Sequence, residues 1–506
     1  MPMNGAERSG IGFPVWEQSY YEECCQMQHQ ISKVTEPSRE LPVAGTADVV
    51  VAGGGPAGFA AAIASARAGA KTILLEEKSF LGGVATAVMM TALVCSPWAN
   101  GIALEIMDLM AKKGGAVKWE PEKRKNGTTP FDAECFKECA LEMCLDAGVE
   151  LHLYTRACAP VLEAGRAKGV IVESKAGRTA FLGDIVIDCT GDADLAFMAG
   201  APVYKGRETD NKMRPFALLF QVGGLDIEKI AAYTKANPDQ LQPQHTHDTR
   251  HKIGDEEVIT RISGFYDLVE KAKAAGELYD GIHYFRLETL WVNRGIAICN
   301  TTRIYNMDGT DPADLTKGEI IGRQQIKKLI DFARKYIPGC ENAYIISVAP
   351  AMGVRETRRI KGEVFLSTDD AINDRHFDDA IMTFRIHIPP VELMKELDVH
   401  MPEPIEGSDL DLIEKHPDRV PAEPHEFQVP YRALVPRNVG GMLVAGKTLS
   451  VSHYIDGHTR NMVSCMHFGQ AAGAAAALCA KKGCEPVELE FALLKDALIQ
   501  QGYTRF

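Results

Sequence analysis

The sequence predicts an α/β fold, with one parallel-sheet domain assembled from separated stretches of the chain and an α+β domain inserted between them. Three observations predict this fold. A β-branched strand near residue 50 leads through glycines into a small-residue helix. Another apolar strand ends at Asp188, and a strand at Gly441–Ala445 precedes an alanine-rich helix. Because these strands lie far apart in the sequence, the predicted sheet is discontinuous.

A glycine-rich turn joins the first strand, Asp48–Ala52, to a helix expected over Ala57–Ala68. Its spacing is Gly53-x-Gly55-x-x-Gly58. In a dinucleotide-binding turn the first glycine permits the tight bend, the second lets the backbone approach a pyrophosphate, and the third lets helix and strand pack closely. The helix N-terminus then faces the phosphates. The spacing alone is weak evidence, and its place between a strand and a helix strengthens it.

Glu76 ends the second strand, Lys71–Leu75, about 20 residues beyond the glycines. An acid at this position is expected to accept a hydrogen bond from a ribose hydroxyl, and its charge disfavours a 2′-phosphate. The alternative is a solvated carboxylate at a strand end. The position favours the ribose contact, so the sequence predicts a dinucleotide-binding domain of Rossmann type.

Three further stretches indicate which dinucleotide is bound: Leu81-Gly82-Gly83, the strand Asp184–Asp188 leading to Thr190-Gly191-Asp192, and Gly441–Lys447 followed by Gly469–Gly473. We expect the last helix to open at Gly469 and to end near Lys482. Its N-terminal dipole would face the pyrimidine edge of an isoalloxazine and stabilise negative charge on the reduced ring. The alternative for this helix alone is a small-residue packing helix.

These stretches resemble the flavoproteins with two dinucleotide-binding domains. The chain resembles the bacterial FAD-dependent oxidoreductases, distant relatives of the fumarate reductase flavoprotein and of the heterodisulfide reductase flavin subunit. The resemblance runs from about residue 47 to 480 and rests on Val51–Gly58, Asp188–Asp194, Gly353–Arg359, Val429–Leu434 and Gly469–Gly473. It implies a discontinuous Rossmann-type FAD-binding domain, glutathione-reductase-like, with an inserted α+β substrate domain. It names no substrate, because the group is functionally diverse.

The resemblance also implies which residues contact FAD. Fumarate reductase flavoproteins often carry a His just before the glycine pair that bonds covalently to FAD, whereas this chain has Lys78-Ser79-Phe80, so we expect non-covalent FAD. Disulfide reductases place a cysteine pair just after the glycines, but here Cys95 stands alone, which disfavours a dithiol relay. The predicted FAD contacts are Gly53, Gly55, Pro56, Ala57, Gly58, Glu76, Glu77, Lys78, Gly82, Gly83, Thr190, Gly191, Asp192, Gly446, Gly469, Gln470, Ala471 and Gly473.

The order of these stretches predicts how the chain is divided. The N-terminal arm packs either on the body or on a neighbouring subunit, and homo-oligomer formation stays open. Apolar residues at helical spacing predict a helix over Asp311–Tyr336, and the acid- and proline-rich stretch Pro389–Pro430 predicts a loop or cap. The predicted parts are an arm over 1–46, the FAD-binding domain over 47–200 with an excursion near 110–130, the substrate domain over 201–428, and the rest of the FAD-binding domain over 429–506.

A polar segment, Ser452–Asn461, lies between the last strand and the last helix, where the predicted topology crosses the reactive face of the flavin. Its His453, Asp456, His458 and Arg460 can supply a general acid or base and a clamp for a substrate anion. Fumarate reductase flavoproteins place a His and then an Arg here, so the resemblance suggests a carboxylate or polar carbonyl substrate, though the spacing differs. The alternative is that Arg460 holds the loop or FAD while one His is internally hydrogen-bonded.

Arg355 and His387 are the catalytic candidates expected opposite this segment. Arg355 begins an Arg-Glu-Thr string, whereas Arg358 and Arg359 more often make surface ion pairs. Arg385 and His387 alternate with apolar residues in a strand pattern, which places both on one face. That face lines either the substrate cavity or the polar surface.

We predict no metal site. His245-x-His247-x-x-x-His251 has metal-like spacing, but it lies in a loop rich in Gln, Asp and Thr without supporting carboxylates or cysteines, so an exposed loop is expected. Cysteines 135, 139 and 144 have helical spacing, which is not the clustered pattern of an iron–sulfur site.

Composition limits the partners and the compartment. The 506 residues are 46% hydrophobic and 24% charged, which suits a large core. A net charge of −13 disfavours nucleic acid and anionic membrane surfaces. The 13 cysteines are odd in number and scattered, and the first forty residues carry charges without an apolar core, so we expect a cytoplasmic protein without a secretory signal or a membrane span.

The sequence therefore predicts an enzyme, an FAD-dependent oxidoreductase of the dehydrogenase or reductase type. It would transfer a hydride between flavin N5 and a small polar organic substrate that bears a carboxylate, carbonyl or hydroxyl, with an unknown external electron donor or acceptor. Two alternatives stay open. One is an oxidase or monooxygenase that uses oxygen, and the other is a flavin electron-transfer subunit that acts with a protein partner.

Overall fold

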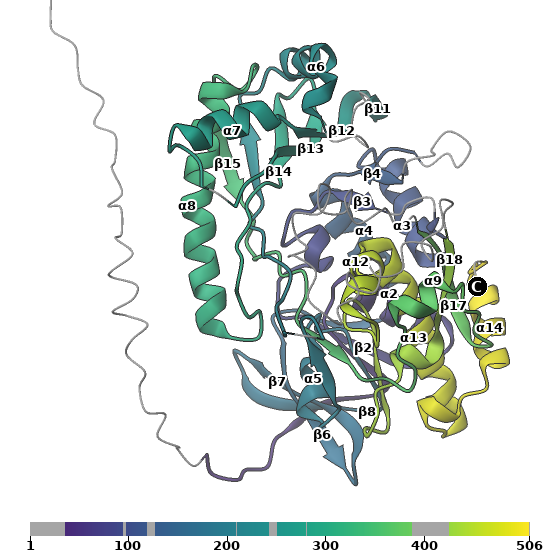
Figure 1. The fold of residues 1–506 in the computed structure, drawn as a ribbon. Helices are drawn as coiled ribbons and strands as arrows, with labels where there is room; N and C mark the ends of the chain where they lie inside the picture. The colour runs from purple at the N-terminus through teal and green to yellow at the C-terminus, as the bar shows by residue number, and fades with distance from the viewer. Residues whose placement is uncertain are drawn as a thin grey trace, which may run out of the picture. The chain divides into compact units, whose positions relative to one another are not determined.

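The computed structural model describes residues 36–94, 98–118, 127–208, 210–241, 250–279, 281–386, 425–504 and 506 (Figure 1). The chain divides into two compact units, Met1–Leu41 and Pro42–Phe506. In the first unit, the described residues 36–41 form no helix or strand. The second unit contains both of the large sheets.

The first sheet has seven strands and is parallel in its centre, where β5, β2, β1, β8 and β19 lie side by side. Its strands are β1 (Val43–Ala52), β2 (Thr72–Leu75), β5 (Glu150–His152), β6 (Arg156–Glu163), β7 (Arg166–Ser174), β8 (Gly177–Asp188) and β19 (Met442–Val444). The first half of β8 pairs antiparallel with β7, and its end pairs with β19. Stretches from the start, middle and end of the chain thus form one sheet, which confirms the predicted fold class.

Alternate side chains of β1 enter two different cores, so both faces of the parallel sheet are covered. Val49 and Val51 pack with α2 (Pro56–Arg67) and α13 (Met462–Lys482), whereas Val50 and Ala52 pack with β7 and α5 (Asp194–Met198). Two more helices, α3 (Gly101–Lys112) and α4 (Ala133–Asp146), add to the first core. The continuous apolar run in β1 is therefore explained by burial on both sides.

The alanine-rich helix, α13, begins earlier than predicted. It starts at Met462 rather than Gly469, after the N-cap Asn461, whose Oδ1 accepts a hydrogen bond from the Ser464 N–H at 3.1 Å. A Cβ on Gly469 or Gly473 would overlap the carbonyl oxygens of α2, so these glycines allow the two helices to approach closely. The glycines mark a helix crossing and not a helix start, and the end at Lys482 agrees with the prediction.

The polar segment that the sequence predicts as a loop is a short helix, α12 (His453–Thr459). Ser452 caps it, because its hydroxyl oxygen accepts from the Ile455 N–H at 3.3 Å. A serine before such a turn satisfies a free backbone donor. The helix fixes the spacing of His453, Asp456 and Arg460.

The second sheet is antiparallel, in the order β11-β12-β13-β14-β10-β15. Helix α8 (Pro312–Tyr336), capped by Asp311, matches the predicted helix, and its Ile326, Leu329 and Phe332 pack on the sheet (Figure 1). The strands and remaining helices are β10 (Phe220–Gly223), β11 (Arg250–Ile253), β12 (Glu256–Gly264), β13 (Phe285–Trp291), β14 (Ile296–Cys299), β15 (Tyr344–Val348), α6 (Ile227–Ala236) and α7 (Tyr266–Ala274).

Shorter elements lie outside the two large sheets. They are β3 (Ala92–Val94), β4 (Thr128–Pro130), β9 (Val203–Lys205), β16 (Arg358–Ile360), α9 (Thr368–Ile372), β17 (Ala380–Ile386), β18 (His425–Pro430) and α14 (Phe491–Gln500). Among the described residues, one helix, α13, is long and apolar enough to cross a membrane, and 94% of its apolar window is buried inside the protein.

Several predictions concern residues outside those the structure describes. They are the arm up to residue 35, Cys95, His245, His247, His387 and most of the predicted cap over 389–430. Arg385 lies on β17, opposite Glu426 of β18, and His251 lies on β11.

Candidate active site

The glycines of the turn between β1 and α2 differ in whether the protein's own packing requires them. Gly53 has a φ of 99°, and a Cβ there would overlap the Cys189 carbonyl oxygen, while a Cβ on Gly58 would overlap the Gly53 carbonyl oxygen. By contrast, the nearest atom to a Cβ on Gly55 is the Gly83 Cα at 4.0 Å. The protein's own packing demands glycine at 53 and 58, whereas open space lies beside Gly55.

This open space adjoins the N-terminus of α2. In the described part of the chain no side chain caps this helix, and its first turn, from Pro56 and Ala57, carries no acid. Gly82 and Gly83, with φ values of 107° and 50°, lie against the turn, and the Gly82 N–H donates to the Gly54 carbonyl at 2.9 Å. A cradle of exposed backbone donors at a helix N-terminus fits a pyrophosphate.

Glu76 ties the cradle to the end of β2. Its Oε2 accepts from the Gly54 N–H at 2.6 Å and its Oε1 from the Lys78 N–H at 2.8 Å, and the residue is 6% exposed. Glu77 and Lys78 form an ion pair with each other. Because a carboxylate has about four acceptor positions, these two amides leave Glu76 able to accept a ribose hydroxyl.

The turn after β8 brings Thr190, Gly191 and Asp192 to the same edge of the sheet. The Thr190 hydroxyl and N–H donate to Oδ1 of Asp188 at 2.7 and 3.0 Å, and burial raises the pKa of Asp188. Asp192 accepts from Lys447 Nζ at 2.7 Å and from Thr357. Gly446, which has a φ of 118°, directly precedes that lysine. A Cβ added to Gly446 would lie 3.5 Å from the Cβ of Ala57. The three predicted stretches therefore meet around the start of α2.

The predicted contacts on α13 have packing partners inside the protein. Gly469 and Gly473 face α2, Ala471 is fully buried, and Oε1 of Gln470 accepts from the Ile102 N–H at 3.0 Å. They lie about two turns inside the helix, so Met462 and its neighbours occupy the N-terminus instead. A contact between these four residues and the cofactor stays a prediction.

His453, the first residue of α12, is buried and bonded to a buried carboxylate. Its Nδ1 lies 2.8 Å from Oε1 of Glu356, and its Nε2 has no hydrogen-bond partner among the described residues. Burial and the nearby Arg214 and Arg359 lower the pKa of His453 well below its usual value, so the imidazole is neutral at pH 7. Since a carboxylate only accepts, Nδ1 carries the proton and Nε2 keeps its lone pair.

Asp456 lies one turn further along α12 and is fully buried. Neither carboxylate oxygen has a hydrogen bond within the described chain, although Arg214 Nε lies 3.7 Å and Arg460 Nε 4.0 Å from Oδ2. Burial and the nearby Glu356 raise the pKa of Asp456 to about 6, because they outweigh the arginines. Unsatisfied buried polar atoms cost about 1–3 kcal/mol each and call for a ligand or a mechanistic role.

Arg214 and Arg359 complete what we call the α12 cluster, formed by Arg214, Glu356, Arg359, His453 and Asp456. Nη2 of Arg214 donates to the His453 carbonyl at 2.7 Å. Arg359 is fully buried, bonded to Glu208 at 2.9 Å and 3.3 Å from Glu356. Both arginines thus hold the Glu356–His453 pair in place.

The other two candidates on this segment lie at its far end. The half-buried ring of His458 packs edge-on against Tyr454, with centroids 5.2 Å apart. Arg460 is the residue directly after α12, near Asp456. His453 and Asp456 therefore join the α12 cluster, while His458 lies against an aromatic ring.

Arg355, which lies between β15 and β16, belongs to a second group of charges. Burial, Arg303 and Arg460 lower its pKa well below the usual value, so these guanidinium groups lie within electrostatic reach of one another. Its sequence neighbours turn elsewhere, since Arg358 pairs with Asp194 at 2.8 Å. Arg355 is the residue of this string that faces other cations.

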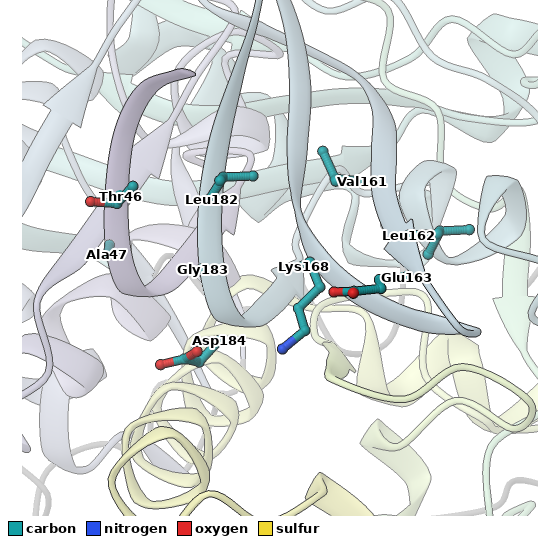
Figure 2. A pocket seen from close by; sticks show the side chains of 9 residues that line it. All are labelled: Thr46, Ala47, Val161, Leu162, Glu163, Lys168, Leu182, Gly183 and Asp184. Atoms are coloured by element: carbon teal, nitrogen blue, oxygen red, sulfur yellow. The ribbon is translucent and has the colours of Figure 1, made fainter. Parts of the chain in front are cut away.

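A hollow of about 620 Å³ lies at the end of the parallel sheet opposite to the glycine turn (Figure 2). It is lined by β1, β6, β7 and β8, including Thr46 and Lys168. Thr46 is about 20 Å along β1 from the glycine turn at the rise of an extended strand. This hollow therefore has no part in the cofactor cradle.

A family model described as FAD dependent oxidoreductase matches residues 48–498. The chain belongs to this FAD-dependent oxidoreductase family. It is accordingly a flavoenzyme whose cofactor is FAD, and the open cradle at the start of α2 agrees with a dinucleotide. A search of curated proteins gives no match.

Two solved structures are similar to this oxidoreductase over most of its length. A geranylgeranyl bacteriochlorophyll reductase-like protein from Thermoplasma acidophilum is 13% identical with a TM-score of 0.46, over 91% of this chain and 84% of that one. A myxobacterial chondrochloren halogenase is 12% identical with a TM-score of 0.41, over 90% of this chain and 79% of that one. At these values neither likeness assigns a substrate or a reaction.

Several residues of the oxidoreductase's site have no signal in a motif. Glu356 stands in the arginine string and looks there like an ion-pair partner, and Arg214 lies in no recognisable pattern. Their roles appear only because distant elements bring them to α12. Gly457 of α12 lies close to Arg214, because a Cβ at Gly457 would be 2.9 Å from Arg214 Nη2.

Proposed function

We propose that this FAD-dependent oxidoreductase transfers a hydride between flavin N5 and a carbon atom of a small polar organic substrate, and that His453 exchanges the accompanying proton. The observation that supports this most is the Glu356–His453 pair, a neutral imidazole whose Nδ1 is bonded to a buried carboxylate and whose Nε2 is unpartnered in the described chain. FAD, when bound, supplies the two-electron acceptor or donor.

The pair divides the proton chemistry between its members. In the oxidation of a C–OH or C–NH group, Nε2 of His453 takes the hydroxyl or amino proton as the hydride leaves the carbon, and in the reverse direction it returns that proton. Glu356 fixes the tautomer and stabilises the imidazolium that forms. Burial keeps this imidazole unprotonated near neutral pH, so the lone pair of Nε2 is available to accept the proton.

The other predicted residues have orienting and binding roles in this proposal. Arg214 holds the first residue of α12 through its carbonyl. Asp456 and Arg460 position the substrate beside His453. The predicted FAD contacts from Gly53 to Lys78, Gly82–Gly83, Thr190–Asp192 and Gly446 hold the cofactor without a covalent bond.

The first test is whether the purified protein carries flavin that a substrate can bleach. Under anaerobic conditions, a panel of hydroxy acids, enoates, sugars, amines and aromatic glycosides should include one class that reduces the flavin, or reoxidises it if reduced beforehand. A protein that shows no flavin absorbance and binds no added FAD would contradict the proposal.

The second test assigns the proton to a residue. His453→Ala should lower the bleaching rate by about 10²–10⁴-fold while FAD stays bound, because a general base is removed. His376→Ala, at an exposed position before β17, is the matched control and should bleach normally. Normal bleaching in His453→Ala, or a loss that appears only in His458→Ala, would show that His453 is not the base.

A further inference from the structure

We propose that Arg355, Arg303 and Tyr284 bind a carboxylate of the substrate, so that the enzyme acts on small organic acids. This inference rests on the proposed function, since the bound acid would present its reacting carbon to the flavin and to His453. It adds a binding site of defined chemistry, whose Tyr284 and Arg303 lie in the segments just before β13 and after β14.

Tyr284 is the centre of this site. It directly precedes β13, is buried, and accepts a hydrogen bond from Arg303 Nη2 at 2.6 Å. The guanidinium carbons of Arg286 and Arg303 lie 4.8 and 5.5 Å from the centroid of its ring. Burial would raise the pKa of the Tyr284 phenol, but Arg303, Arg286 and Arg355 lower it to about 8.

Arg303 is held in place before any ligand arrives. Its Nη1 donates to the Thr302 carbonyl at 2.7 Å, and its backbone N–H donates to Gln325 of α8 at 2.9 Å. The residue is 4% exposed. A guanidinium fixed this way loses little freedom when it binds an anion.

Arg355 supplies the cation that no protein group neutralises. In the part of the chain that the structure describes, it has no hydrogen bond and no ion pair. It is partly accessible to solvent, so a ligand can reach it, while its surroundings still lower its pKa. A desolvated guanidinium beside other cations is costly unless an anion pairs with it.

The nearby carboxylates are engaged elsewhere. Glu288 is bonded to Arg261 at 2.9 Å, although its charge also reaches Arg286. Glu356 follows Arg355 in sequence but is directed to His453 and Arg359. Asp456 has its own arginines. Among the described residues, Arg355 therefore keeps a positive charge that is paired with no carboxylate, and a bound anion would pair with it.

The position of Arg460 connects this site to the proposed base. It lies near Asp456 of α12 and close enough to Arg355 to lower the pKa of that arginine. The anion site and the α12 cluster are thus neighbours, which favours a short acid over a long one. The planar forks of arginine match a planar carboxylate through two parallel hydrogen bonds.

The test is a titration of purified holoenzyme with non-oxidisable probes at constant ionic strength, followed by the change in flavin absorbance. The probes are acetate and benzoate, with acetamide and benzamide as their neutral counterparts, and inorganic phosphate as the competing anion. We expect saturable binding of at least one carboxylate, with its amide about 10–100-fold weaker.

Four variants, one of them a control, assign the binding to the site. Arg355→Met should weaken the carboxylate about 10–100-fold and leave the amide unchanged, and Arg355→Lys, which keeps the charge but not the fork, should lie between. Arg323→Met is the matched control, because Arg323 is exposed on α8 and paired with Glu319. If Arg355→Met does not fold, Tyr284→Phe, which removes one donor, should weaken the carboxylate selectively.

Three outcomes would overturn the inference: carboxylate and amide binding alike, phosphate binding where carboxylates do not, or wild-type affinity in Arg355→Met. Failure of this inference and of the proposed function can be told apart. Carboxylate binding that survives in His453→Ala while bleaching is unaffected there would contradict only the proposed base. Bleaching by neutral substrates without carboxylate binding would contradict only the anion site.

Discussion

The glycine turn of β1–α2 and the α12 cluster are built in opposite ways. The turn lies within one strand–turn–helix unit, and a Cβ on Gly58 would overlap the Gly53 carbonyl oxygen of the same unit. A Cβ on Gly53 would overlap a backbone oxygen too, that of Cys189 at the end of β8. The α12 cluster joins Arg214, Glu356 and His453 from distant parts of the chain. Several of its buried polar atoms have no hydrogen bond to any residue that the structure describes. Local steric constraint can be seen in the sequence, whereas a site balanced by long-range electrostatics cannot.

The largest expected effect separates packing from binding inside the turn. Gly58→Ala places a Cβ onto the Gly53 carbonyl oxygen, so we expect it to unfold the domain or lower its free energy of unfolding by about 1–3 kcal/mol or more. Gly55→Ala meets only Gly83 at 4.0 Å and should leave the apo-protein's melting temperature unchanged while FAD affinity falls at least about tenfold. Thermal melts and FAD titrations measure both.

Each glycine variant is the control for the other. Equal losses of stability in the two variants would contradict the division between packing and binding. Unchanged FAD affinity in Gly55→Ala would mean that the open space beside the turn is not where the cofactor approaches.

An intermediate effect on the free energy of unfolding is expected at Asp456, whose buried carboxylate is costly to ionise. The pKa of Asp456 rises from 3.8 to about 6 on folding, so the folded state binds the proton more tightly, and wild-type stability falls as the pH rises from about 4 to 6. Asp456→Asn removes this penalty. It should be more stable than wild type by up to about 3 kcal/mol at pH 8, and the difference should vanish near pH 4.

Denaturant unfolding at several pH values measures this difference, and the bleaching rate should fall in the same variant if the carboxylate positions the substrate. A variant that is less stable than wild type at pH 8 would contradict the electrostatic account of the α12 cluster.

The smallest effect is expected at Gly457, a glycine whose added Cβ would crowd a residue of the α12 cluster. A Cβ there lies 2.9 Å from the flexible end of Arg214, so Gly457→Ala should displace that guanidinium slightly. The gain in helix propensity, up to about 1 kcal/mol, offsets the crowding, and the melting temperature should change little. The bleaching rate should fall a few fold because the His453 carbonyl loses part of its support. A loss of stability above about 2 kcal/mol would instead place Gly457 among the glycines that packing requires.

How much the sequence predicts follows the same division. The strands around Gly53 and Asp188, helix α8 and the discontinuous sheet are predicted because periodicity and glycine spacing act over short stretches. The start of α13 is predicted wrongly, since a glycine that permits helix crossing looks like one that opens a helix. The polar segment before it is predicted as a loop, although Ser452 caps a helical turn there.

At the site, the sequence brings forward His453 and Arg355 but not their partners. Glu356 lies inside the Arg-Glu-Thr string, which does not reveal its partner, and Tyr284 lies in no motif. Their importance depends on contacts with residues far away in the sequence or in separate elements, His453 for Glu356 and Arg303 for Tyr284. No local pattern encodes a pairing between residues about a hundred positions apart. His387, also a candidate, lies outside the described residues.

The most direct test of the account is a double-mutant cycle on the anaerobic bleaching rate with Glu356→Gln and His453→Ala, measured on protein that retains FAD. If the two residues act as one proton-transfer unit, each single change should slow bleaching by about 10²-fold or more, and the double variant should be no slower than His453→Ala alone. Losses that multiply in the double variant, or a Glu356→Gln enzyme that bleaches like wild type, would contradict it.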